Sequence, residues 1–225
     1  ALTLELNRTL SDARISKIQQ PEPSELLITF RTQHGTEKLL LSANASLPSA
    51  YLTEESKPSP AEAPNFCMLL RKHIGSARVK TVTQPGLERI LEISLEHPDE
   101  LNDLREKRLI VELMGKYSNI IFTDGQGTIL DAIRHVTPAM SSVRTVLPGR
   151  AYFIPDTQRK KDLLTETREG FLSGLSPRDT LAESVAGRYT GVSFQTVQEL
   201  LYGGAVDWGR LMGHGIQHQH RHTAV

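Results

Sequence analysis

Short apolar runs, separated by residues that form tight turns, fill this chain from about residue 14 to residue 134. Proline fixes φ and glycine tolerates positive φ, so such residues favour reversal of the chain at Pro21–Ser24, His34–Gly35, Pro85–Gly86 and Asp124–Gly127. Apolar and β-branched runs between turns predict an antiparallel sheet or sandwich. The predicted strands are Arg14–Gln20, Glu25–Arg31, Glu37–Ser42, Ala77–Gln84, Arg89–Glu96, Leu109–Met114, Asn119–Thr123 and Thr128–Arg134.

A helix interrupts this series between Asn65 and Ile74, where apolar residues recur at spacings of three and four and so share one face. The preceding prolines mark a loop, and Pro64 suits the first turn of a helix. Arg71 and Lys72 then point away from the apolar face. A shorter helix is expected at Leu2–Leu10.

After Pro155 the pattern becomes helical, which predicts a β-rich domain over residues 1–155 and a small all-helical domain over residues 156–225. Ser176 and Ser193 both have the position of helix N-caps. Their spacing suits helical hairpins whose exposed amides can hold a phosphate, although the same residues also cap ordinary helices. The predicted helices are Lys160–Leu172, Pro177–Arg188, Ser193–Tyr202 and a weak one near Trp208.

The residue sets of common enzymes are absent from the sequence. It contains no phosphate-binding loop, no dinucleotide fingerprint, no His-Glu-x-x-His and no nucleophile elbow. Cys67 is the only cysteine, which excludes an internal disulfide and a zinc site made of cysteines. We therefore expect no catalytic activity, no cofactor and no metal. Four C-terminal histidines could in principle bind a metal ion, but they lack the apolar surroundings and the nearby carboxylate that would hold them in place; they are His214, His218, His220 and His222.

No stretch approaches the roughly 20 apolar residues of a membrane span, and the start lacks the features of a secretory signal. We expect a cytoplasmic protein without a membrane partner. The formal net charge is zero, but residues 66–91 and 132–161 are both basic segments. Such segments can bind phosphates or simply face solvent.

Several segments of the chain together form a recognisable set of motifs. They are Arg14–Pro21, Leu40–Asn44, Asn65–His73, Glu112–Ile121, Arg144–Tyr152 and, more loosely, Tyr189–Ser193 with Glu199–Leu201. This set resembles the NFACT family, which includes bacterial RqcH, the proteins called fibronectin-binding protein A, and eukaryotic NEMF. The resemblance is collinear from about residue 10 to residue 155, is looser beyond, and covers only the front of a larger protein.

The resemblance implies an α+β fold: a β-sandwich with few helices, similar to the N-terminal domain of formamidopyrimidine-DNA glycosylases, followed by a helix-hairpin-helix or helix-two-turn-helix module. It does not imply glycosylase chemistry, because the N-terminal proline and the four zinc cysteines are missing.

The resemblance also implies a function in ribosome quality control. Such proteins bind tRNA, chiefly alanine tRNA, beside a 50S subunit that carries a stalled peptidyl-tRNA, and the ribosome itself supplies the chemistry of alanine tailing. The family's tRNA contact includes an acidic-Arg pair, usually Asp-Arg, which matches Glu88–Arg89 here. Glutamate is one methylene longer, so Arg89 is the safer assignment.

A guanidinium beside a carboxylate suits RNA recognition, although a local salt bridge at a turn explains the same pair. We expect further cations to join Glu88 and Arg89 on one RNA-binding face: Arg14, Lys17, Arg71, Lys72, Arg78, Lys80 and Arg144. The alternative function is a surface adhesin that binds fibronectin or fibrinogen.

Overall fold

A computed structural model describes residues 1–98, 103–155 and 160–203, in two compact units, Ala1–Arg159 and Lys160–Val225. The predicted boundary at residue 155 lies beside residues 156–159, which are outside the described residues. The helices and strands of the N-terminal unit are α1 (Leu2–Leu10), β1 (Arg14–Gln19), β2 (Glu25–Thr32), β3 (Gly35–Ser42), β4 (Ser49–Leu52), α2 (Asn65–Ile74), β5 (Arg78–Thr83), β6 (Ile90–Pro98), β7 (Leu104–Glu112), the 3-10 turn η1 (Gly115–Tyr117), β8 (Asn119–Asp124) and β9 (Ile129–Ala132).

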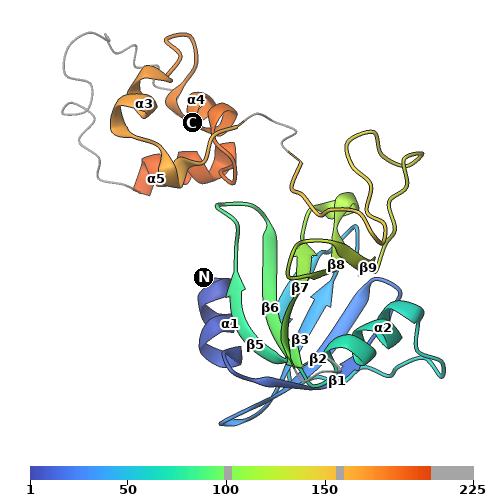
Figure 1. The fold of residues 1–225 in the computed structure, drawn as a ribbon. Helices are drawn as coiled ribbons and strands as arrows, with labels where there is room; N and C mark the ends of the chain where they lie inside the picture. The colour runs from blue at the N-terminus through green and yellow to red at the C-terminus, as the bar shows by residue number, and fades with distance from the viewer. Residues whose placement is uncertain (99–102, 156–159, 204–225) are drawn as a thin grey trace. The chain divides into compact units, whose positions relative to one another are not determined.

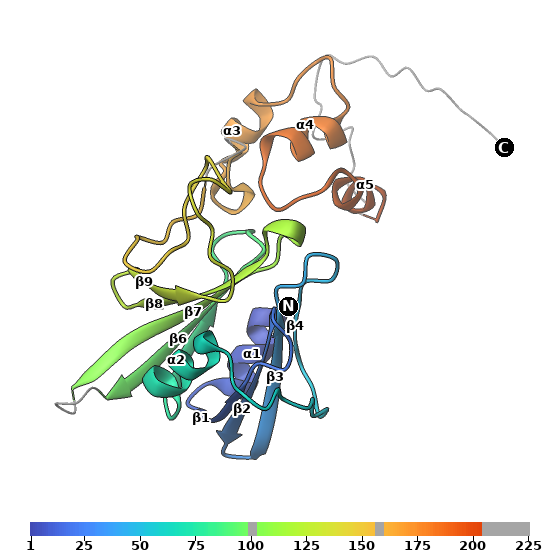
Figure 2. The ribbon, with the colours of Figure 1, turned by 90° about the vertical axis from the view of Figure 1, so that its right-hand side faces the viewer.

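The N-terminal unit is built on one antiparallel sheet of nine strands in the order β4-β3-β2-β1-β5-β6-β7-β8-β9 (Figure 1). Side chains from β1, β2 and β3 share a single buried cluster with side chains from β6, β7 and β8. The sheet therefore folds over its own core, and Figure 2 shows its two halves set at an angle. The predicted β-rich domain with few helices is confirmed.

Both helices of this unit pack against that core. Leu6 and Leu10 of α1 are fully buried, as are Cys67, Leu70 and Ile74 of α2. The predicted bounds of both helices are confirmed. Burial of Cys67 also raises the pKa of its thiol.

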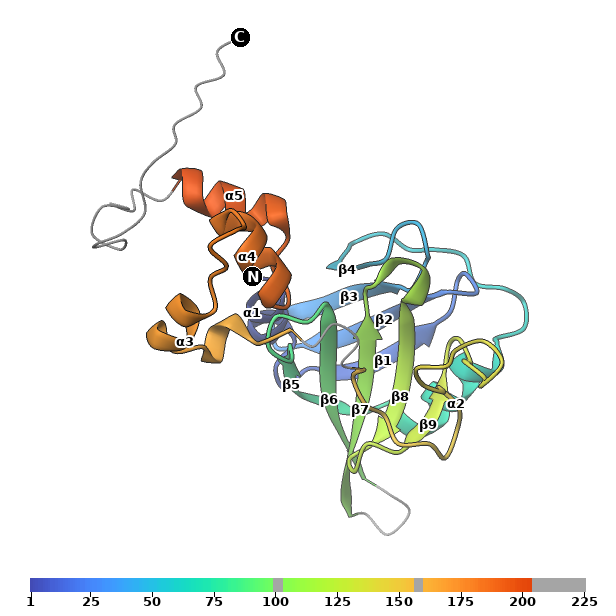
Figure 3. The same cartoon turned by 90° about the horizontal axis from the view of Figure 1, so that it is seen from above.

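A second, smaller cluster lies on the opposite face of β6, β7 and β8, which Figure 3 shows side by side. Adjacent strand residues such as Ile110 and Val111 belong to different clusters, because successive side chains point to opposite faces. Val146 from the loop after β9 covers this second cluster. The sequence missed the short strand β4 and the charged first half of β7.

The C-terminal unit contains η2 (Leu163–Thr165), α3 (Arg168–Ser173), α4 (Leu181–Arg188) and α5 (Phe194–Gly203). The prediction of one helix over Lys160–Leu172 was wrong in its first part. Asp162 caps the short turn η2 and Thr167 caps the separate helix α3. Their side chains accept hydrogen bonds from backbone amides that a continuous helix would use.

Ser176 does not cap α4, which was a second error. Thr180 does so instead, in a capping box with Glu183, so the helix starts later than Pro177. Ser193 does cap α5, since its hydroxyl accepts from the Thr196 amide at 3.0 Å. The helix expected near Trp208 and the C-terminal histidines lie outside the described residues. None of the described helices is both long enough and apolar enough to cross a membrane.

Candidate nucleic-acid interface

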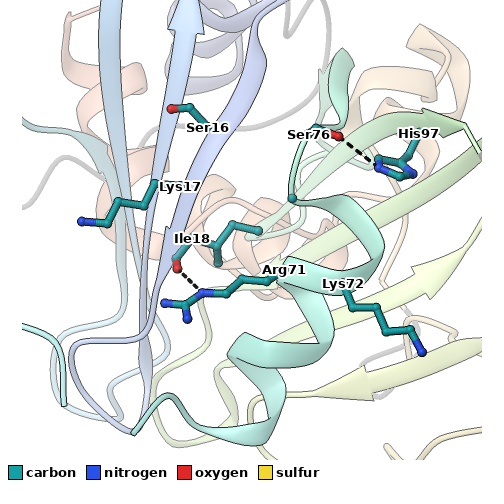
Figure 4. A pocket seen from close by; sticks show the side chains of 8 residues that line it. Ser16, Lys17, Ile18, Arg71, Lys72, Ser76 and His97 are labelled. Atoms are coloured by element: carbon teal, nitrogen blue, oxygen red, sulfur yellow. Dashed lines mark hydrogen bonds between the residues drawn. The ribbon is translucent and has the colours of Figure 1, made fainter. Parts of the chain in front are cut away.

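An open groove of about 660 Å³ lies between β1 and the C-terminal end of α2 (Figure 4). It brings together the predicted site residues Lys17, Arg71 and Lys72, and none of the described residues that line it carries a carboxylate. The other residues of the lining are Ser16, Ile18, Gly75, Ser76 and His97.

Arg71 is fixed in this groove by a hydrogen bond from its Nε to the carbonyl oxygen of Ile18, at 2.8 Å. The Nη1 of Arg71 also donates to the Met68 Sδ at 3.8 Å, and the residue as a whole remains exposed. Lys72 points away from Lys17 and Arg71 in Figure 4, so the three cations of the groove do not converge on one point. Basic residues in the last turn also stabilise the C-terminal end of α2 through the helix dipole, which requires no ligand.

The predicted site residues of β5 are neutralised within the fold. Arg78 forms ion pairs with Asp12 at 3.3 Å and Glu96 at 3.1 Å, and Lys80 pairs with Glu96 at 3.3 Å and Glu106 at 3.6 Å. Hydrogen bonds from Arg78 and Lys80 lower the pKa of Glu96. Arg78 and Lys80 therefore hold less free positive charge than the sequence suggests.

Arg14 has a like-charged neighbour on each side. It lies opposite Arg31 of β2 and opposite Arg78 of β5, and all three side chains are exposed. We call Arg31, Arg14 and Arg78 the cationic row. Among the described residues, Arg14 and Arg31 form no ion pair with a carboxylate, and like charges placed directly opposite each other are destabilising. Arg31 was missed by the sequence analysis, because only the strand register places it here.

Glu88 and Arg89 lie in the turn between β5 and β6, and Arg89 is exposed. The turn is braced by the amide of Glu88, which donates to Pro85 at 3.0 Å, and by the side-chain amide of Gln84, which donates to the Glu88 carbonyl at 2.7 Å. The amide of Leu113, the residue after β7, donates to the Arg89 carbonyl at 2.9 Å.

The single face predicted for all these residues is not what the structure shows. Arg78 lies opposite Glu96, and the turn with Glu88 and Arg89 lies at the other end of the same hairpin. At about 3.3 Å per residue, Arg89 is roughly 20 Å from the cationic row. The candidate cations therefore form two exposed groups: the turn, and the groove with the cationic row.

Arg144, which was predicted to join the RNA surface, belongs to neither exposed group. Its side chain is 12% exposed and pairs with Glu112, which is fully buried, and it also donates to the Phe153 carbonyl at 2.9 Å. Tyr152 donates to the same carboxylate at 3.0 Å. Burial lowers the pKa of Arg144, but Glu112 outweighs that effect and the net shift is upward. Arg144 thus anchors the loop after β9 to β7.

Comparison with known proteins identifies relatives that match most of the chain. A family model described as NFACT N-terminal and middle domains matches residues 1–219. The Rqc2 homolog RqcH of Bacillus subtilis is 38% identical over 194 residues, which cover 85% of this chain and 34% of that relative. The human ribosome quality control complex subunit NEMF is 26% identical over 185 residues, which cover 82% of this chain and 16% of NEMF. The chain thus spans about a third of the length of its bacterial relative.

Solved structures agree with this comparison. The N-terminal part of the fibronectin/fibrinogen-binding protein of Streptococcus suis is 34% identical with a TM-score of 0.83, and the match covers 91% of this chain and 77% of that one. The N-terminal domain of fibronectin-binding protein PavA of Streptococcus pneumoniae is 30% identical with a TM-score of 0.81, covering 93% and 80%. RqcH of Streptococcus suis is also 34% identical to this chain. Proteins named for ribosome quality control and proteins named for fibronectin binding are therefore equally similar to it in sequence.

Proposed function

The chain belongs to the NFACT family, and from that premise we propose that it is the front part of a cytoplasmic, non-catalytic ribosome quality-control factor that binds tRNA. In this proposal it binds alanine tRNA beside a 50S subunit that carries a stalled peptidyl-tRNA, and so supports alanine tailing. The helices of the C-terminal unit would add a helix-hairpin-helix type contact with RNA.

The observation that carries the proposal is the exposed Arg89 beside Glu88 on a braced turn. A guanidinium offers a planar fork for a phosphate or a base edge, and a carboxylate accepts from base amino groups. Since three backbone or side-chain hydrogen bonds hold this turn, binding would lose little conformational freedom. The groove and the cationic row would add attraction that depends on salt.

Titration of labelled alanine tRNA into the purified chain at several salt concentrations tests this proposal. We expect Arg89→Ala to weaken binding by about tenfold, the equivalent of one charge-assisted hydrogen bond, without a change in thermal unfolding. Removal of Arg14 and Arg31 should lower the salt slope by about 0.7 to 0.9 for each phosphate that is no longer neutralised. Arg150→Ala, another exposed arginine outside both groups, is the matched control and should bind like the wild type. Unchanged tRNA affinity in all of these variants would disprove the proposal.

The second candidate is binding of fibronectin or fibrinogen, because the similar solved structures carry those names. Immobilised fibronectin presented to the same variants distinguishes the two functions. An RNA-binding factor should co-sediment with 50S particles and should bind tRNA less tightly after Arg89→Ala, whereas an adhesin should bind fibronectin with the same affinity before and after that substitution.

A further inference from the structure

Tyr117 is an exposed aromatic residue at the same end of the sheet as the Glu88–Arg89 turn. Its side chain remains 68% exposed, whereas Tyr152 and Tyr189 are partly or fully covered. The ammonium group of Lys116 lies 5.0 Å from the centre of the Tyr117 ring. A single exposed aromatic residue is common on protein surfaces, so its exposure alone does not identify a site.

Several hydrogen bonds fix the backbone that carries Tyr117. Gly115 has φ of +56°, which glycine adopts without strain, and the Ser118 hydroxyl accepts from the Met114 amide at 2.8 Å. The Arg134 guanidinium donates to the Lys116 carbonyl at 2.7 Å and also to the Ala43 carbonyl at 3.4 Å. Arg134 thus ties η1 to the loop between β3 and β4, and the ring is presented by a preorganised turn.

The position of η1 relates this ring to the proposed tRNA contact. Leu113, whose amide donates to the Arg89 carbonyl, lies two residues before the start of η1. Figures 1 and 2 both show η1 and the turn between β5 and β6 at the same end of the sheet. This end therefore presents an aromatic ring, an ammonium, a guanidinium and a carboxylate from two neighbouring segments.

From these observations we propose that Tyr117 stacks on an unpaired base of the RNA that Glu88 and Arg89 bind. Unpaired bases in RNA loops stack on aromatic side chains, while nearby polar groups read their edges and phosphates. A base inside a duplex has both faces covered by its neighbours, so the ligand is a loop of folded RNA. Lys116 is placed to neutralise the adjoining phosphate. This inference rests on the proposed function and adds Tyr117 to the residues of the proposed RNA contact.

An RNA hairpin with 2-aminopurine in its loop tests the inference with the full chain. Stacking quenches 2-aminopurine, so the wild type should quench it and Tyr117→Ala should not. Tyr117→Ala should also weaken binding by about tenfold or more, as expected when one base no longer stacks, while Tyr117→Phe should retain both affinity and quenching. Tyr51→Ala removes another exposed tyrosine, 45% exposed on β4, and should have no effect.

Two outcomes overturn the stacking assignment: wild-type affinity and quenching in Tyr117→Ala, or an equal loss in Tyr117→Phe and Tyr117→Ala. A fully paired RNA duplex should bind the wild type and Tyr117→Ala equally. Arg89→Ala, measured with the same hairpin, separates the two proposals. If Arg89→Ala weakens binding and Tyr117→Ala does not, only the stacking assignment fails; if neither weakens it, the proposed tRNA contact fails as well.

Discussion

Arg89 and Arg144 both come from basic segments of the sequence, but they differ in exposure and in partners. Arg89 extends from an exposed turn, whereas Arg144 is nearly covered and pairs with a buried carboxylate 32 residues away in sequence. The sequence predicts positive charge at both positions, but the partner of Arg144 becomes its neighbour only when the loop after β9 folds back on β7. Arg89 was assigned through the family resemblance, and the structure shows it exposed in the turn before β6.

Loss of the Arg144 side chain should destabilise the N-terminal unit strongly. Arg144→Ala leaves the buried Glu112 carboxylate without its cation, so we expect the free energy of unfolding in urea to fall by about 3 to 5 kcal/mol. Combined replacement, Arg144→Met with Glu112→Leu, removes both charges and should recover most of that loss. A fall below about 1 kcal/mol for Arg144→Ala would mean that the pair behaves like an exposed one.

Single elements were predictable to the extent that their signals are local. The bounds of α2 follow from its apolar spacing and the proline before it, and Ser193 was recognised as the cap of α5. The first half of β7 was missed because Leu104–Arg108 is mostly charged, and only pairing with β6 makes it a strand. The like-charged pair of Arg14 and Arg31 depends on register, which the sequence alone left open.

The hairpin of β5 and β6 should show a stability that depends on pH through Glu96. Because Arg78 and Lys80 lower the folded-state pKa of Glu96 below its ordinary 4.5, Glu96 stabilises the fold above pH 4.5. This contribution is lost as pH falls from 4.5 through the lower folded-state value. Glu96→Gln should therefore be less stable than wild type in urea at pH 7, and the difference should disappear in acid.

A double-mutant cycle supplies the control for this prediction. In a background with Arg78→Met and Lys80→Met, Glu96→Gln should change the free energy of unfolding little at either pH. A difference between wild type and Glu96→Gln that stays constant from pH 7 into acid would assign the effect to packing instead of charge.

The whole molecule consists of two units with separate buried clusters. The two larger clusters, with the side chains packed on them, draw on residues up to Ile154, and the third draws on residues from Leu163 onward. The sequence indicated this change of character through the shift from strand to helix patterns after Pro155. It could not indicate that the predicted RNA-binding cations would occupy opposite ends of one hairpin, because that follows from strand order and register.

Residues 1–155 should consequently fold without the rest of the chain. Their clusters are complete within this segment, so we expect the shortened chain to unfold cooperatively with the same urea midpoint as the corresponding transition of the full chain. Within the described residues 160–203, the buried cluster consists of Ala182, Val185, Tyr189 and Val197, which is small, so this segment alone should unfold over a broad range. If the shortened chain keeps the Arg89-dependent part of tRNA binding, then the C-terminal unit adds affinity but does not form the contact; a lower midpoint would show that the units stabilise each other.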